Sequence, residues 1–462
     1  MIDRRRFLAS LAAAALPAAA FPAAARTANA STPLGTLRPD PLGILDLPAG
    51  FTLAVVSRVG DLMQDGLRVP GRHDGMAAFT GDDGRVVLVC NHELSPRQRS
   101  MSAFGADFEA LPGEVRQAFY DRGGGRTPGT GGTTTTVFNP RTGETERQHL
   151  SLAGTEINCA GGPTPWRTWL SCEECFESPG TALTYGGPVI RERSHGHVFE
   201  VAADENGLVE PRPIEAMGKF EHEACAVHEP TGIVYMTEDR HHSLFYRFIP
   251  DVPGRLHEGG RLQALAIDGQ PSLSTHNWSR RASIGVGESL PVRWIDLDDV
   301  NPVENDLRLR GATAGAATFA RGEGLCAVAG TFAFTCTIGG PARLGQIFVY
   351  TPSPKEGQPD ETSSPGQLVL LAESDDQSLL RNADNVTLAP WGDLVVCEDT
   401  ATHCGLVGVR PDGSQYAIAD NTYSDSELAG VCFSPDGQTL FVNIQVPGMT
   451  VAITGPWPVV SA

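Results

Sequence analysis

Residues 223–239 read EACAVHEPTGIVYMTED and predict a β-hairpin. Two short apolar stretches flank the dipeptide Thr231-Gly232, which is a favourable turn sequence between two strands. In a hairpin, the start of the first strand and the end of the second strand lie side by side. The carboxylates of Glu223 and Asp239 are therefore expected at the same end of this hairpin.

The same order of polar start, apolar strand, turn, apolar strand and polar end recurs along the chain. The further segments are residues 74–93, 158–174, 323–337, 384–399 and 427–445. An irregular internal repeat favours a fold in which each repeat adds its own part of the core. We predict an all-β fold, a single six-bladed β-propeller over residues 31–462, with the polar hairpin ends meeting at one end of the central axis. The alternative is a β-sandwich whose strand ends are acidic.

Residues 1–30 have the composition of an export signal. Residues 4–8 (RRRFL) match a twin-arginine pattern, an alanine-rich apolar run follows, and residues 28–30 (ANA) form a small-residue cleavage site. We predict a twin-arginine signal peptide that the twin-arginine machinery recognises, and a periplasmic or secreted mature protein. The alternative is an alanine-rich leader without this role. No other stretch is long and apolar enough to span a membrane.

The charge of the chain restricts its partners. The formal net charge is −20, and the leader carries more arginine than acidic residues, so the mature protein is more acidic still. Nucleic acid is excluded as a partner, because its phosphates require basic patches on a protein. An acidic body is typical of a protein that binds cations, and it also promotes solubility.

The predicted fold gathers many carboxylates at one end of the axis. They are Glu93, Glu173, Glu174, Glu223, Glu238, Asp239, Glu323, Asp384, Glu398, Asp399 and Glu427. Partly buried carboxylates that are crowded together cannot all ionise without a counter-charge. Either several of them have raised pKa values or cations occupy the site, and hard cations such as Ca²⁺ bind oxygen ligands of this kind.

One cysteine and one arginine stand out at this end. Cys159 opens the second hairpin, and a thiolate among carboxylates favours iron or zinc over calcium. The alternative is that Cys159 is a small buried residue. Arg321 lies two residues before Glu323, so the two side chains share one face of a strand. Arg321 is predicted to bind phosphate oxygens with its planar fork, the alternative being a structural ion pair.

The chain resembles the PhoX family of bacterial alkaline phosphatases. The segments that carry this resemblance are residues 158–174, 220–240, 319–328, 382–399 and 426–448. The resemblance implies a six-bladed propeller that is exported by the twin-arginine route. It also implies that Fe³⁺ and Ca²⁺ ions on the axis support the hydrolysis of phosphate monoesters at alkaline pH.

The resemblance also implies roles for individual residues. Cys159 is expected to bind iron, and Arg321 is expected to be the catalytic residue that contacts phosphate. Metal binding is expected of the glutamates Glu173, Glu174, Glu223 and Glu323. Asn91 is expected to contact substrate, and further metal ligands are expected at Glu93, Asn385 and Glu398. The chain departs from the family pattern at Arg167, where a glycine is expected. It is also shorter than the best-known members of the family, whose extra substrate-contacting loops are therefore not expected by resemblance, and this leaves the substrate range open.

The sequence therefore predicts an exported, metal-dependent alkaline phosphatase. Its expected partners are small phosphorylated substrates, monoesters first and diesters second, and the protein is expected to be a monomer. One alternative is a calcium-dependent propeller lactonase or phosphotriesterase, which needs no iron. The other is a secreted propeller that binds a partner without catalysis.

Overall fold

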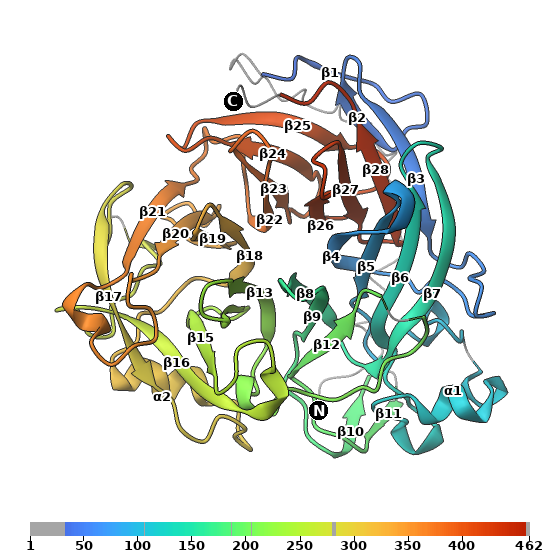
Figure 1. Cartoon of the computed structure of the whole chain (residues 1–462), viewed down its shortest axis with the longest axis horizontal. Coiled ribbons are helices and arrows are strands. Elements are labelled where there is room, and N and C mark those ends of the chain that lie inside the picture. The colour runs from blue at the N-terminus through green and yellow to red at the C-terminus, as the bar shows by residue number, and fades with distance from the viewer. Residues whose placement is uncertain (1–32, 106, 186, 205, 280–282, 459–462) are drawn as a thin grey trace, which may run out of the picture.

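The computed structural model describes residues 33–458 except residues 106, 186, 205 and 280–282. The predicted signal peptide lies outside these residues. Strands dominate the described chain and are arranged like blades around a central axis (Figure 1). The prediction of an all-β, propeller-like fold is confirmed. No helix in the described part of the chain is long and apolar enough to cross a membrane.

Each predicted hairpin forms a pair of antiparallel strands. The pairs are β4 (His73–Thr80) with β5 (Val86–His92), β8 (Asn158–Pro163) with β9 (Thr168–Glu173), β13 (His222–His228) with β14 (Ile233–Glu238), β18 (Gly322–Val328) with β19 (Thr331–Cys336), β22 (Ala383–Leu388) with β23 (Leu394–Glu398), and β26 (Leu428–Phe433) with β27 (Thr439–Ile444). The first strands contact one another in the order β4, β8, β13, β18, β22 and β26, and β26 contacts β4. These strands therefore form a closed ring around the axis (Figure 1).

Further strands extend the pairs outward. They are β6 (Gly131–Asn139) and β7 (Glu144–Thr155) beyond β5, β12 (Val198–Ala202) beyond β9, β15 (Tyr246–Pro250) and β16 (Gly260–Ile267) beyond β14, β20 (Gln346–Thr351) and β21 (Gln367–Glu373) beyond β19, β24 (Gly405–Val409) and β25 (Gln415–Asn421) beyond β23, and β28 (Met449–Thr454) beyond β27. β17 (Ser289–Asp296) pairs with both β16 and β21. It thereby merges the strands of two hairpins into one nine-stranded sheet.

Strand pairing joins the two ends of the chain. β3 (Thr52–Arg58), near the start of the described chain, pairs with β28 near its end. β2 (Leu45–Pro48) pairs with β25, and β1 (Leu37–Arg38) pairs with β2. The ring therefore cannot open without breaking the hydrogen bonds of a sheet, which keeps the polar hairpin ends at a fixed spacing.

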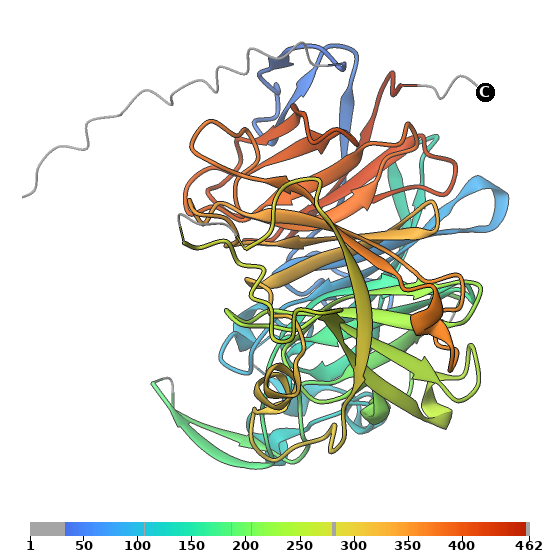
Figure 2. The same cartoon turned by 90° about the vertical axis from the view of Figure 1, so that its left-hand side faces the viewer.

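Insertions lie at the polar end of the ring, where each second strand leaves its hairpin. The longest connects β5 to β6 and contains the short helix α1 (Gly113–Gln117). The connection from β9 to β12 contains the hairpin of β10 (Gly180–Thr184) and β11 (Gly187–Arg191), which extends away from the blades in Figure 2. A second helix, α2 (Leu307–Ala314), lies in the connection from β17 to β18.

Every hairpin carries a register shift near the start of its first strand. Two residues of the first strand oppose one residue of the second strand, which is the pattern of a β-bulge. The bulge residues are Asp74-Gly75, Cys159-Ala160, Glu223-Ala224, Glu323-Gly324, Asp384-Asn385 and Gly430-Val431. Because the repeats share this geometry, the polar side chains of five of these pairs lie at one level around the axis. The sixth pair has Gly430 in the corresponding position.

The bulges require small residues where neighbouring first strands approach. A Cβ atom on Gly75 would lie 2.5 Å from the Cα atom of Ala160 in the next strand of the ring. We predict that Gly75→Ala lowers the free energy of unfolding by about 1–3 kcal/mol, because the backbone of one strand must move. Chemical denaturation measures this change. The control is Gly113→Ala, where a Cβ atom meets nothing within 4 Å, and an equal loss of stability in both variants would contradict the prediction.

Candidate metal centre

The polar end of the ring holds three groups of side chains that could each bind a cation. They are Cys159 with Glu174 and Glu223, Asp74 with Glu93 and Glu427, and Glu223 with Glu323 and Asp384. Within each group the ligand atoms lie within 4.8 Å of one another. Glu223 belongs to two groups, and Sγ of Cys159 in one of these lies 3.7 Å from Oδ1 of Asp74 in the third, so the three groups are adjoining parts of one centre. The structure thus brings together Cys159, Glu93, Glu174, Glu223 and Glu323, as expected from the sequence.

The repeat places the ligands at three kinds of position. The bulge positions supply Asp74, Cys159, Glu223, Glu323 and Asp384. The strand-end positions are the residues that directly follow the second strand of each hairpin. They are Glu93, Glu174, Asp239, Thr337, Asp399 and Gln445. Each strand-end residue donates its backbone N–H to the carbonyl oxygen of a residue that precedes the bulge, which we call the lead position. The lead positions are Arg72, Ile157, Glu221, Arg321, Asn382 and Glu427.

The carboxyl groups of this centre have raised pKa values. Burial raises the pKa of Asp74, Glu174, Glu223, Glu323 and Glu427 well above the ordinary value, and neighbouring carboxylates raise it further. The pKa of Asp384 is raised to about 7, first by burial and then by Asp399. In addition, no hydrogen-bond partner faces the buried Oε2 atom of Glu223 in the described residues. Cations would replace the missing positive charge, so the donor set fits a metal centre.

Cys159 supplies the one thiol of these groups. Its Sγ atom lies 3.4 Å from Oε1 of Glu223 and 3.7 Å from Oδ1 of Asp74, so its single S–H can donate to either carboxylate. Burial raises the pKa of this thiol, and the carboxylates of Asp74 and Glu223 raise it further. A thiol in these surroundings becomes a thiolate only with a positive charge beside it, and a sulfur ligand favours iron or zinc over calcium.

Arg321 lies beside the same carboxylates. Its Nε and Nη2 atoms donate to the two oxygens of Asp239 at 2.6 and 2.7 Å, and Nη2 lies 3.0 Å from Oε1 of Glu323. The carboxylate of Glu323 is the largest cause of the raised pKa of Arg321, although burial opposes it. The guanidinium is therefore charged and held in one orientation at the polar end of the ring.

A second arginine at this end was not predicted from the sequence. The Nε atom of Arg72 donates to Oε2 of Glu93 at 3.0 Å, and Nη2 pairs with the same oxygen. Gln445 donates to this oxygen and to Oδ2 of Asp74, both at 2.8 Å. The signal for Arg72 was available, since it lies two residues before Asp74 just as Arg321 lies two residues before Glu323.

Glu173 does not join the three groups. It lies in a separate buried cluster, where its Oε1 atom is 2.6 Å from Nδ1 of His195 and its Oε2 atom accepts from the backbone of Gly196 at 2.8 Å. Burial opposes ionisation of Glu173, but His195 outweighs it and lowers the pKa of this carboxyl group. Successive side chains of a strand point to opposite faces, which explains why Glu173 and Glu174 differ.

The two other predicted metal ligands, Glu398 and Asn385, form hydrogen bonds within the protein. Both carboxylate oxygens of Glu398 accept hydrogen bonds from the backbone. The N–H of Arg381 donates to one oxygen at 2.9 Å, and the N–H of Gly405 donates to the other at 3.0 Å. Asn385 donates to Asp384 and accepts from the backbone of Gly430.

Asn91 lies opposite the first bulge and holds the second bulge in place. Its Nδ2 atom donates to the carbonyl oxygens of Cys159 at 3.0 Å and Ala160 at 2.7 Å. Its Oδ1 atom accepts from Trp169 and Ser171, both at 2.8 Å. The amide therefore has its two donors and its acceptor occupied by protein groups, and it fixes the backbone of Cys159.

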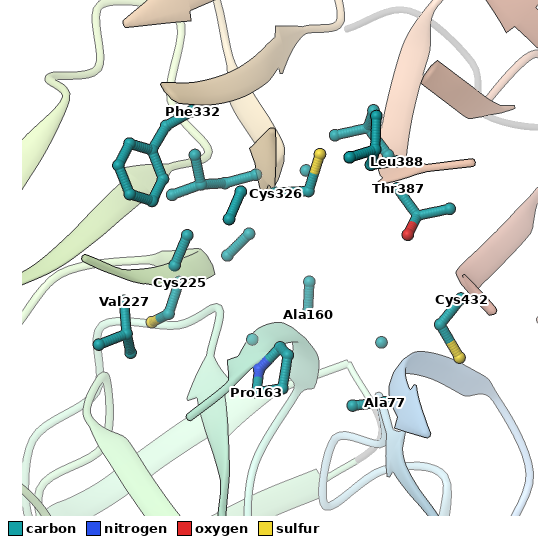
Figure 3. Close-up of a pocket in the computed structure, with 18 of the residues that line it drawn as sticks. Ala77, Ala160, Pro163, Cys225, Val227, Cys326, Phe332, Thr387, Leu388 and Cys432 are labelled. Carbon is teal, nitrogen blue, oxygen red and sulfur yellow. The ribbon is translucent and has the colours of Figure 1, made fainter. Parts of the chain in front are cut away.

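A cavity of about 740 Å³ lies along the axis on the other side of the bulges (Figure 3). The small second residues of the bulges, such as Gly75, Ala160 and Gly324, form its inner end. Its walls are mainly apolar, including Val227 and Leu388, and no ligand of the three groups lines it. The chemistry of the site therefore belongs to the opposite, polar end of the axis.

Comparisons with known proteins agree with this geometry. A family model described as alkaline phosphatase PhoX matches residues 32–448. The chain belongs to the PhoX family of alkaline phosphatases. It is therefore a phosphatase, and the acidic centre on the axis is its candidate active site. A search of curated proteins gave no match.

Solved structures support the same fold. PhoX of Pseudomonas fluorescens, in complex with the transition state analogue vanadate, has a TM-score of 0.66 and 18% sequence identity, and the match covers 92% of this chain and 97% of that chain. A gluconolactonase of Xanthomonas campestris has a TM-score of 0.43 and 13% identity, with 92% of this chain and 99% of that chain covered. The similarity to the Pseudomonas structure shows that this phosphatase has the same propeller-like fold.

The raised pKa values predict how metal-free phosphatase responds to pH. A carboxyl group whose pKa rises on folding stabilises the folded state at low pH, and this contribution is lost as pH rises through the folded pKa. The pKa of Asp384 is raised to about 7 and that of Glu238 to about 8, in both cases first by burial. Burial lowers the pKa of His222 to about 3. This shift makes the stability of the fold rise with pH, but only below about pH 6.5, the ordinary pKa of histidine.

We therefore expect the melting temperature of chelator-treated protein to fall between about pH 6.5 and pH 8.5. Thermal melts with and without added calcium and iron measure this effect, and the metal-loaded protein should show a smaller fall. A melting temperature that rises over this range without metal would contradict the charge balance of the centre.

Proposed function

We propose that this phosphatase hydrolyses phosphate monoesters, with diesters as a second substrate class, at an iron and calcium centre on the axis of a six-bladed propeller. The closed ring of first strands from the six repeats supports the number of blades. The observation that carries the proposal is the set of three adjoining ligand groups, two of which share Glu223 and one of which contains a thiol. A phosphate ester needs positive charge at its oxygens, and these groups are built to hold cations.

The ligand types suggest how the ions divide. Cys159, Glu174 and Glu223 would hold iron, because this group contains the sulfur ligand. The two all-carboxylate groups, around Asp74 and around Glu323, would hold calcium. When bound, the ions supply positive charge to the phosphate oxygens and lower the pKa of water.

The residues of the chain bind and orient the substrate. Asp239 fixes the fork of Arg321, and the guanidinium is positioned to bind phosphate oxygens and to stabilise the charge that develops on them. Asn91 holds the backbone of Cys159 in place, and Asn385 holds that of Gly430. Neither amide needs to contact substrate for this role.

Export and domain organisation extend the proposal. We propose that residues 1–30 are a twin-arginine signal and that residues 31–462 form one propeller domain that acts as a monomer in the periplasm or outside the cell. The leader pattern supports this assignment. Export of a folded protein is consistent with a metal centre whose ligands come from all parts of the chain.

The first test concerns the thiol. Enzyme matured in iron and calcium should release p-nitrophenol from p-nitrophenyl phosphate. Cys159→Ser should lose most of its iron and at least about 100-fold in kcat/KM, since loss of a ligand disrupts both binding and charge. Elemental analysis and initial rates measure these effects, with Cys326→Ser, in the apolar cavity, as the control. Iron-free enzyme with full activity would favour a calcium-only hydrolase, and metal-replete enzyme without turnover of any monoester or diester would exclude the proposed reaction.

The second test concerns the guanidinium. Arg321→Gln should lower kcat/KM by about 100-fold with metal content unchanged, because a donor aimed at developing charge is lost. Arg321→Lys should recover only part of this loss, since lysine lacks the planar fork. Steady-state kinetics with metal analysis on the same preparations checks both variants. Normal kcat/KM in Arg321→Gln would show that the ion pairs with Asp239 and Glu323 are purely structural.

A further inference from the structure

The repeat places Arg72 and Arg321 at matching positions. Both occupy a lead position, and both accept a backbone hydrogen bond from a strand-end residue, Glu93 to Arg72 at 2.9 Å and Thr337 to Arg321 at 3.0 Å. Both have a left-handed backbone, with φ of 47° at Arg72 and 58° at Arg321. Ile157 and Asn382 share this backbone but carry no charge, and the remaining lead positions are acidic.

The order of the ring places these arginines on opposite sides of the axis. Arg72 precedes β4 and Arg321 precedes β18, and two first strands separate β4 from β18 in either direction around the ring. The candidate metal centre lies between them, since Asp74 and Glu323 belong to it and lie two residues after Arg72 and Arg321.

Both guanidinium groups use the same atoms to bind carboxylates and leave the same atom available. Nε and Nη2 of Arg72 bind Glu93, and Nε and Nη2 of Arg321 bind Asp239. In neither arginine does Nη1 donate a hydrogen bond to any residue that the structure describes. The side chains are 24% and 28% exposed, so ligand can reach them.

We propose that Arg72 is a second anion-binding residue, which contacts the phosphate group of the substrate from the side opposite Arg321. This inference rests on the proposed function. Glu93 orients Arg72 as Asp239 orients Arg321, and the Nη1 groups of both arginines are available to donate to a tetrahedral anion that has several oxygens to share. The competing explanation is that Arg72 only neutralises Glu93 and has no contact with substrate.

The test compares Arg72→Gln with wild-type enzyme, both loaded with iron and calcium. Loss of a charge-assisted contact to phosphate should raise KM for p-nitrophenyl phosphate and the inhibition constants of inorganic phosphate and vanadate by about 10–100-fold. The metal content per chain should stay unchanged. Guanidinium chloride added to Arg72→Ala should lower KM again, because it returns the missing cation to the site.

The matched control is Arg167→Gln. Arg167 also has a left-handed backbone, with φ of 65°, and a forked ion pair with Asp204, but it lies in the turn between β8 and β9 at the other end of the axis. Unchanged KM and inhibition constants in Arg72→Gln, with or without a fall in metal content or melting temperature, would overturn the proposal. If wild-type enzyme hydrolyses no phosphate ester while it still binds phosphate through Arg72, the proposed function fails and this inference stands.

Discussion

The structure depends on the cost of placing many carboxylates together in a region with little water. Burial and mutual repulsion both disfavour the ionised forms, so the pKa values of Asp74, Glu174 and Glu223 lie well above their ordinary values. A protein without a cation in this region must keep protons on these groups. The fold resists relaxation of this arrangement, because the first strands form a closed ring and β3 joins β28 across the chain ends. The carboxylates cannot separate, and cations are the remaining way to relieve the repulsion.

The β-bulge is the local device that builds this arrangement. An ordinary strand alternates its side chains between two faces, whereas a bulge redirects one side chain without ending the strand. Repetition of the bulge brings five polar side chains to one level, and the small partners Gly75, Ala160 and Gly324 let neighbouring strands approach. The glycine of the sixth repeat fits the same reasoning. Its backbone N–H donates to Asn385, so the bulge position of this repeat supplies structural support, and the candidate ligand of the repeat is Glu427 at the lead position.

Much of the fold and of the site could be predicted from local patterns. Turn dipeptides and alternating apolar runs are short-range signals, and they identified every hairpin and its polar end. The sequence could not predict that β17 pairs with both β16 and β21, since that pairing depends on the relative placement of two repeats. The bulges were also missed, because they appear only in the register between two strands. Arg72 was missed because it precedes the first repeat segment and lies outside the segments that carry the family resemblance, whereas Arg321 lies within one of them.

Glu173 and Glu174 show why an acidic residue near the axis is not by itself a metal ligand. Glu173 belongs to a cluster in which His195 is charged: burial opposes the charge, but the carboxylates of Glu173, Asp121 and Glu156 together outweigh burial and raise the pKa of His195 to about 10. In the same cluster the fork of Arg191 binds Glu156 at 2.8 and 2.9 Å.

Glu174 is one residue further along the chain and lies in a group with Cys159 and Glu223. This group contains no positively charged side chain. Elsewhere in the metal centre, by contrast, Arg72 pairs with Glu93 and Arg321 pairs with Glu323. The balance between carboxylates and the protein's own cations therefore separates the structural cluster from the centre that requires metal.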